Sequence, residues 1–335
     1  MKKVLLLLIT IMLLTGCGKV DKDKLVDDFV DKVESSKAYY LSGKMEIYNG
    51  EDTFSYDVEV SYMDDDYYKV RMVNSINSHE QIILKDTEAV YVVTPSLNKS
   101  YKFVSEWPYN SSQAYILNTL VKDIESDQGL EFKEEDDGYS LKTIVNYPNN
   151  NSLIYEKLYF DKDMNLKRVC VYDKDDVIAI DVVISKIDYK ANLSEKDFDI
   201  NSLIDENCCN TEVETDDVET SALEDIIYPL YVPANTYLNG KELVSTENGE
   251  RVILTFNGEK NFVLIEEPSK SLEEFEIIPV YGDPMMMTSS IGSLSSNSLS
   301  WSNDNVDYYL TSNDLSTEEI LTIADSLNTF ELIEK

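Results

Sequence analysis

Alternation of apolar and polar residues, repeated along many segments, is the feature that most constrains the fold of this chain. Between residues 54 and 62, every second residue is Phe, Tyr or Val, and the residues between them are Ser, Asp or Glu. A period of two predicts a strand with one buried and one solvated face. Similar segments predict strands over residues 68–72, 81–84, 89–94, 130–133, 139–147, 154–160, 166–172 and 178–185. An antiparallel sheet of this length must curl or close.

A helix-like stretch interrupts these strands. The segment 99–123 begins as a strand, turns at Trp107-Pro108 and restarts as a helix that Ser111 or Ser112 could cap. Four apolar side chains then recur with helical spacing, at Leu117, Leu120, Val121 and Ile124. A second amphipathic helix is predicted over residues 23–34. We therefore expect an α+β fold in which an apolar helix lies against a curved antiparallel sheet.

The second half of the chain predicts a separate, smaller unit. No Lys or Arg occurs from Asp197 to Gly240, and acidic residues are frequent there. Asn257-Gly258 between two strand-like runs indicates a hairpin, and Ser316 to Glu319 fits a capping box that begins a helix. The Ser-rich run 289–300 suggests a loop or an edge strand. The expected division is a signal peptide (1–17), a half-barrel domain (20–204), an acidic linker (205–226) and a small α+β domain (227–335).

The first residues predict export and lipid attachment. Lys2 and Lys3 precede an apolar run, 4–14, that is too short to span a bilayer. The run ends in Leu14-Thr15-Gly16-Cys17, which resembles a lipobox. Lipidation of Cys17 would place the chain on the extracytoplasmic face of the cell membrane. The alternative is an ordinary signal peptide with a chance cysteine.

Charge and residue inventory argue against several functions. The net charge of −35 argues against nucleic acid, and against an anionic membrane surface, as direct partners because both would repel the chain. Cys170 lies within a predicted strand and reads as a small buried residue, whereas Cys208-Cys209 lies in the acidic linker, where a metal or redox role lacks further ligands.

Catalytic motifs fail on their spacing or context. The single histidine, His79, reads as a surface strand residue rather than a triad member. Ser96 to Lys99 matches S-x-x-K by letters but lies in a turn, and the calcium-loop-like run from Asp161 lacks its Gly and Glu. We predict no enzyme activity, no cofactor and no metal.

The run Ser105 to Gln113, together with the order of helix, strands, helix and strands, resembles the LolA/LolB lipoprotein-carrier superfamily. Within it, the run is similar to the spore-former branch that includes GerS-like germination lipoproteins. This resemblance covers about residues 23–200. From Ile227 onward, the chain resembles a small domain found on extracytoplasmic bacterial proteins, and the two-domain layout is similar to that of the envelope sensor RseB.

The resemblance implies an unclosed β-barrel with a helical lid over an apolar hollow. It implies a sporulation or germination lipoprotein that binds a protein partner, such as a cell-wall amidase. The alternative is a carrier or sensor that binds acyl chains or lipoproteins in the hollow. The candidate residues lining this groove, named the groove residues below, are Trp107, Tyr109, Tyr115, Leu117, Leu120 and Val121. Trp107 is expected either as a core anchor under the helix or, with Tyr109, at the mouth of the hollow.

Overall fold

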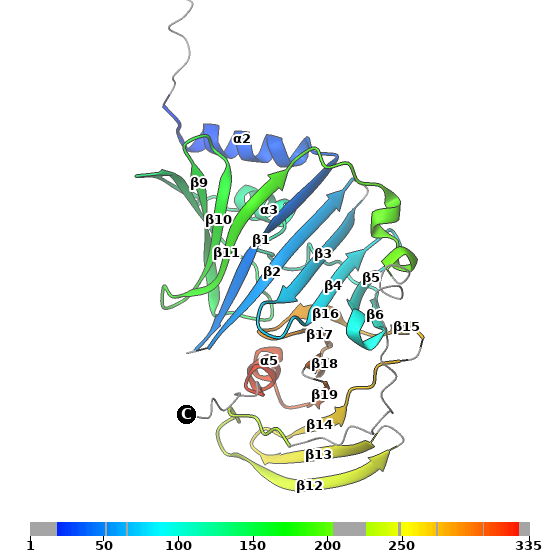
Figure 1. Cartoon of the computed structure of the whole chain (residues 1–335). Helices are drawn as coiled ribbons and strands as arrows, with labels where there is room; N and C mark the ends of the chain where they lie inside the picture. Colours follow the sequence, from blue (N-terminus) through cyan, green and yellow to red (C-terminus); the bar gives the residue numbers. More distant parts are fainter. Residues whose placement is uncertain are drawn as a thin grey trace, which may run out of the picture.

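The computed structural model contains two antiparallel sheets with helices packed on their inner faces (Figure 1). It describes residues 19–327, except 51, 65, 204–225, 247–248, 273 and 304. The first sheet has 12 strands and the second has 7. In Figure 1 the second sheet lies below the first, and its strands β16 and β17 come nearest to the first sheet.

The first sheet runs in the order β15-β6-β5-β4-β3-β2-β1-β11-β10-β9-β8-β7. Its strands are β1 (Ala38–Asn49), β2 (Asp52–Met63), β3 (Tyr67–Asn74), β4 (Glu80–Lys85), β5 (Val90–Thr94), β6 (Lys99–Phe103), β7 (Glu131–Glu135), β8 (Gly138–Ile144), β9 (Leu153–Asp161), β10 (Leu166–Asp173), β11 (Ile178–Asp188) and β15 (Glu276–Pro279). All neighbours are antiparallel except β15 and β6. The end strands β15 and β7 do not pair with each other, so the curved sheet is unclosed, as the family resemblance implies.

Two helices cover the concave face of the first sheet, and the start of the second corrects the sequence prediction. Helix α2 (Lys22–Glu34) is capped by Asp21 and buries Leu25, Phe29 and Val33. Helix α3 (Leu117–Ser126) begins after the predicted Ser111 and Ser112, with Ile116 at its N-cap. Ser112 instead pairs with Asn146, through its backbone N–H and through its hydroxyl, which accepts from the Asn146 N–H. Tertiary bonds have thus displaced the local capping preference.

Short 3-10 helices occupy two connections. They are η1 (Pro95–Leu97) and η2 (Glu195–Phe198). Phe198 is wholly buried against the convex side of β4 and β5, together with Ile82, Leu84 and Val93. The chain after β11 therefore covers apolar residues that the concave core does not reach.

The second sheet runs in the order β12-β13-β14-β19-β18-β17-β16. Its strands are β12 (Thr236–Thr246), β13 (Gly249–Gly258), β14 (Phe262–Pro268), β16 (Asp283–Met286), β17 (Ile291–Leu294), β18 (Ser298–Asn303) and β19 (Val306–Thr311). The predicted loop or edge strand over 289–300 is wrong, because β17 pairs on both sides. Helix α5 (Thr317–Asp325) has the predicted capping box at Ser316 and Glu319 and packs on this sheet.

The two sheets are joined by direct bonds between residues far apart in sequence. Strand β15 extends the first sheet although it follows β14 in the chain. The Lys99 ammonium lies 3.0 Å from Asp307, and the Ile291 N–H donates to Gln81 Oε1 at 2.8 Å. Ile291 also belongs to the hydrophobic core of the first sheet. The second unit therefore completes part of the first sheet's concave core.

Some sequence predictions lie outside the described residues. These are the signal peptide, Cys17, Cys208, Cys209 and almost all of the acidic linker. Cys170 is described and is buried, as predicted, and its thiol is free. Within residues 19–327, as far as they are described, no helix has the length and apolar character needed to cross a membrane.

Candidate functional site in the concave face

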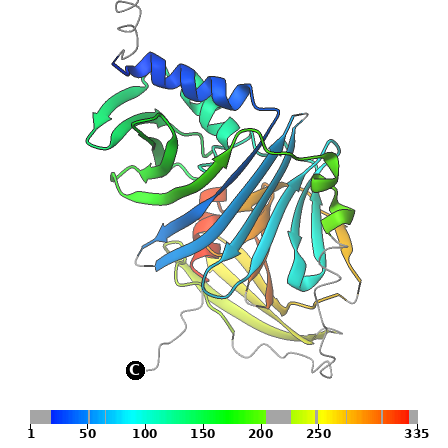
Figure 2. The same cartoon turned by 45° about the horizontal axis from the view of Figure 1, so that its top comes forward.

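Helices α2 and α3 fill one end of the concave face, and β16 and β17 approach the other. Figure 2 shows α3 beside α2, inside the curve of the strands from β7 to β11. The apolar stripe of α3 is buried as predicted, with Leu117, Leu120, Val121 and Ile124 all at most 5% exposed. Because these side chains join one core with the inner residues of β1 to β3 and β8 to β10, α3 is a continuous part of that core.

Trp107 lies deep in this core. Its side chain is 2% exposed, and its ring meets that of Tyr68 edge-on at 6.0 Å. Its backbone N–H donates to Ser105 Oγ at 3.1 Å, which fixes the start of the turn before α3. This placement is the one expected of a core anchor, one of the two alternatives that the sequence leaves open.

Tyr109 is the groove residue that reaches the surface. Its hydroxyl lies 2.6 Å from that of Tyr68, and the ammonium groups of Lys85 and Lys122 lie 5.4 and 5.9 Å from its ring centre. Lys122 also donates to the Tyr109 carbonyl at 2.7 Å, which ties α3 to the preceding loop. Burial raises the pKa of the Tyr109 hydroxyl, so it stays neutral and available for hydrogen bonding.

Tyr115 is buried beside the N-terminus of α3. It is 4% exposed, and its hydroxyl donates to Gln113 Oε1 at 2.7 Å. Burial raises the pKa of this hydroxyl as well. The structure thus brings the groove residues into one core, with only Tyr109 half-exposed. Their role in binding stays a prediction.

A pair of buried carboxyl groups lies in the same core, and sequence reasoning missed it. Asp123 on α3 is 6% exposed, and Glu156 on β9 is wholly buried. The alternation of the strand could have located Glu156, because it lies on the same face of β9 as the core residues Leu158 and Phe160. The abundance of acidic residues in the chain obscured this signal.

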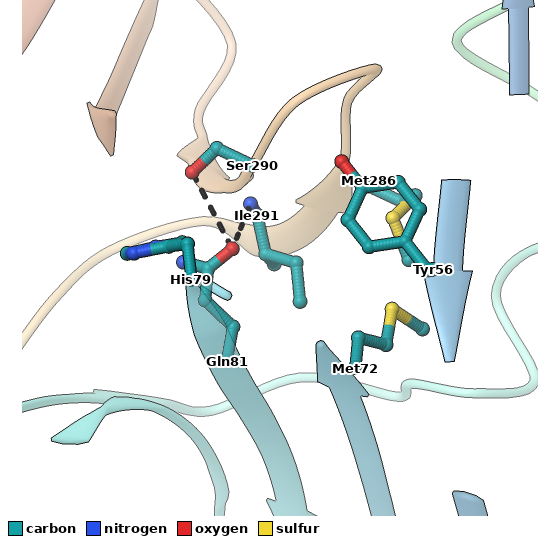
Figure 3. Close-up of a pocket in the computed structure, with 7 residues that line it drawn as sticks. All are labelled: Tyr56, Met72, His79, Gln81, Met286, Ser290 and Ile291. Atoms are coloured by element: carbon teal, nitrogen blue, oxygen red, sulfur yellow. Dashed lines mark hydrogen bonds between the residues drawn. The ribbon is translucent and has the colours of Figure 1, made fainter. Parts of the chain in front are cut away.

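A small pocket marks the other end of the concave face, where the two units meet (Figure 3). Figure 3 shows Gln81 Oε1 accepting from the Ile291 N–H and from the Ser290 hydroxyl. The Tyr56 hydroxyl donates to the Thr288 carbonyl at 2.6 Å, and the remaining lining residues are Met72, His79 and Met286. These hydrogen bonds join the first sheet to the segment 288–291, so the pocket lies at a bonded junction between the units.

His79 differs from its predicted place. It lies in the turn before β4 and lines this pocket, and it is not a residue of a surface strand. In the part of the chain that the structure describes, no group of three or more His, Cys, Asp or Glu side chains is arranged to hold a metal ion.

Comparison with curated proteins identifies the family. The chain is 34% identical over 325 residues to the sporulation protein YdcC of Bacillus subtilis (strain 168), covering 96% of this chain and 94% of that protein. The chain belongs to the YdcC family. The match spans the residues of both sheets. No protein-family model matches the YdcC-like chain.

Solved structures similar to this YdcC family member include LolA superfamily proteins, as the sequence resemblance indicates. A LolA superfamily protein from Nitrosomonas europaea matches with a TM-score of 0.31 and 9% identity, over 54% of this chain and 99% of that one. A chain in the complex of the Clostridioides difficile CwlD amidase with the GerS lipoprotein matches with a TM-score of 0.32 and 16% identity. The match covers 52% of this chain and 100% of that one. A chain in the Pseudomonas aeruginosa MucA/MucB complex matches with a TM-score of 0.32 and 10% identity. The match covers 90% of this chain and 97% of that one.

Proposed function

We propose that this chain is a lipid-anchored envelope protein of sporulation that acts by binding another protein and carries out no chemistry of its own. The observation that carries the proposal is the 34% identity to a sporulation protein over both units. The lipobox at Cys17 supports extracytoplasmic anchoring of the chain. The core of the candidate site consists of packed apolar and aromatic side chains, which suit binding better than catalysis.

The proposed partner is a cell-wall amidase. The support for this class is the similarity of the run Ser105 to Gln113 to GerS-like lipoproteins, and a GerS complex with an amidase is among the similar solved structures. Tyr109, half-buried in the middle of that run, is the groove residue positioned to contact a partner. The Tyr109 hydroxyl bonds to that of Tyr68, and Lys85 and Lys122 lie near its ring, so the ring is held in a fixed position that a partner could contact.

Complementation in Bacillus subtilis tests the sporulation role. A strain that lacks YdcC receives either this chain or its Cys17→Ala variant, and heat-resistant spores are counted. We expect the unchanged chain to restore the count to that given by YdcC itself and the variant to fail, because it lacks an anchor. If the unchanged chain is made and membrane-bound but restores nothing, the shared role is wrong. Equal restoration by the variant would remove the anchor from the proposal.

Binding to a purified CwlD-type amidase tests the partner. We expect saturable binding to the full chain, weakened at least tenfold by Tyr109→Ala, with the exposed Tyr281→Ala as the matched control. Native mass spectrometry of the same sample reports whether an acyl chain co-purifies. A bound acyl chain together with no amidase binding would favour the carrier alternative.

A further inference from the structure

Glu156 and Asp123 place three carboxylate oxygens in the core without a hydrogen-bond partner. These are both side-chain oxygens of Glu156 and Oδ2 of Asp123. Buried polar atoms are almost always paired, because an unpaired one costs free energy. Glu156 lies between Thr143 of β8 and Val171 of β10 in the sheet register, which leaves its carboxyl directed at the core below α3. Among the residues that the structure describes, no hydrogen bond satisfies these three oxygens, so the arrangement calls for an explanation beyond packing.

The groups around the pair supply no cation to Glu156. Tyr115 and Tyr147 are neutral hydroxyls nearby, and Ser112 and Thr143 are the other polar neighbours. At the C-cap of α3, Asp127 adds another carboxylate, and on the helix Lys122 is exposed and donates to the Tyr109 carbonyl. On α2, which packs on α3, Lys32 pairs with Asp28 at 2.6 Å. On the strands, Lys142 and Lys157 lie over the ring of Tyr155 on the opposite face.

Electrostatics therefore favour protonated carboxyls while the core is closed. Burial raises the pKa of Glu156 well above its ordinary value, and the charge of Asp123 raises it further. Burial also raises the pKa of Asp123 to about 6, although the Ser112 hydroxyl and Lys122 oppose this shift. At neutral pH, closing the core requires Glu156 to take up a proton that it would lose in water.

The end of α3 lies directly on the strands that carry this pair. Asp127 Oδ2 accepts from the Ile144 N–H at 3.1 Å. The Thr143 hydroxyl is within 3.1 Å of the Asp123 carbonyl and 3.2 Å of Asp127 Oδ2. Since Thr143 is the register neighbour of Glu156, charge on Glu156 acts on the contact between α3 and β8. Two ionised carboxylates there would repel each other across the boundary between helix and sheet.

We propose that Glu156 and Asp123 form a proton-controlled latch that holds α3 on the concave face. The latch is closed while the pair keeps at least one proton, and it opens when both groups ionise. Opening separates α3 from β8 and β9 and exposes the groove residues. The inference concerns access to the concave face, and it does not depend on which partner the proposed function assigns.

Hydrogen exchange of the full chain tests the latch. Protection factors of amides in Leu117–Ser126, corrected for intrinsic exchange, are measured from pH 5.5 to 8.5. We expect them to fall by at least about 100-fold over this range, because the closed helix binds protons that the open helix releases. Amides at the centre of β2 and β3 serve as the internal reference and should change far less.

Matched variants assign the effect. In Glu156→Gln the fall should shrink to less than about tenfold, which leaves the smaller contribution of Asp123. Asp123→Asn should also reduce the fall, whereas Glu125→Gln, an exposed carboxylate on the same helix, should match the unchanged chain. A flat pH profile in the unchanged chain would overturn the proposal without any variant. An undiminished fall in Glu156→Gln would overturn the assignment to this pair.

Discussion

Each sheet of this protein buries one glutamate completely, and the two glutamates differ in what they bind. Glu266 of β14 and Glu156 of β9 are both 0% exposed on the inner faces of their sheets. Glu266 Oε2 accepts from the Ile227 N–H at 3.1 Å, and only its Oε1 is unpartnered. Glu156 has no partner for either oxygen and has Asp123 as its charged neighbour.

Because of this difference, the Glu266 carboxyl has a structural role, whereas the Glu156 carboxyl destabilises the core in which it lies. Glu266 fixes the segment at Ile227 to the second sheet, so its desolvation cost is partly offset by a hydrogen bond and by Lys241. Nothing described offsets the cost at Glu156. A buried acid can therefore serve as an anchor or as a source of instability, and the partner atoms decide which.

The largest expected effect tests whether the two cores are one cooperative unit. Trp107→Ala should lower the free energy of unfolding by about 3–5 kcal/mol, because it leaves a large cavity in the first core. Since Gln81, Lys99 and β15 join the units, we expect the second core to unfold at the same lowered midpoint.

Denaturant titration followed by the fluorescence of Trp301, the remaining tryptophan in the second core, measures this. Tyr109→Phe serves as control, because it keeps the ring and loses one hydrogen bond worth about 1 kcal/mol. A Trp301 midpoint that does not move would show that the two cores unfold independently.

A smaller effect concerns the pH dependence contributed by Glu266. Burial raises the pKa of Glu266 to about 7, whereas in the unfolded chain it is about 4.3. Between these two pH values the folded state binds a proton that the unfolded chain has lost. Its stabilising contribution is complete below the unfolded pKa and is lost as pH rises to about 7, a change of up to about 4 kcal/mol. Glu266→Gln should remove this part of the profile of unfolding free energy between pH 4.5 and 8. The same slope in the variant would contradict the assignment.

The smallest effect contrasts the two glutamates directly. At pH 8, Glu156→Leu should raise the free energy of unfolding by about 1–3 kcal/mol, because an unpaired buried acid is replaced by an apolar side chain. Glu266→Leu should change it by no more than about 1 kcal/mol, because the Ile227 N–H then loses its acceptor. Thermal denaturation of both variants checks the order. If Glu266→Leu is the more stabilised variant, the distinction between the two sites is wrong.

Much of the fold could be predicted because local period and burial agree. Strand β3 alternates cleanly, β2 does so from Tyr56 to Val60, and helix α5 carries its capping box in sequence. Strand β1 was not predicted, because adjacent Tyr39 and Tyr40 and the central Gly43 obscure its period. Strand β12 lies at an edge with both faces largely exposed, so it has no alternation to detect. The start of α3 depends on the Ser112–Asn146 bonds, which join residues 34 positions apart.

The site could be predicted only in part. The apolar stripe of α3 and the burial of Trp107 follow from local patterns in the sequence. Glu156 and Asp123 come together because of the way α3 crosses β8 and β9. The positions of the two residues in the sequence do not predict this crossing. The pocket at Gln81 depends on the second unit returning to the first sheet, which no feature of residues 80–85 indicates.

The parallel pairing of β15 with β6 has a consequence for how the protein is made. Strand β6 begins at Lys99 and its outer neighbour begins at Glu276, about 180 residues later in the chain. During synthesis or export from the N-terminus, the backbone N–H and C=O groups along that side of β6 stay unpaired until most of the polypeptide has emerged. An unpaired strand edge readily recruits other chains, so this interval is when misassembly is most probable. A truncation that ends before residue 276 would leave that vulnerability permanent.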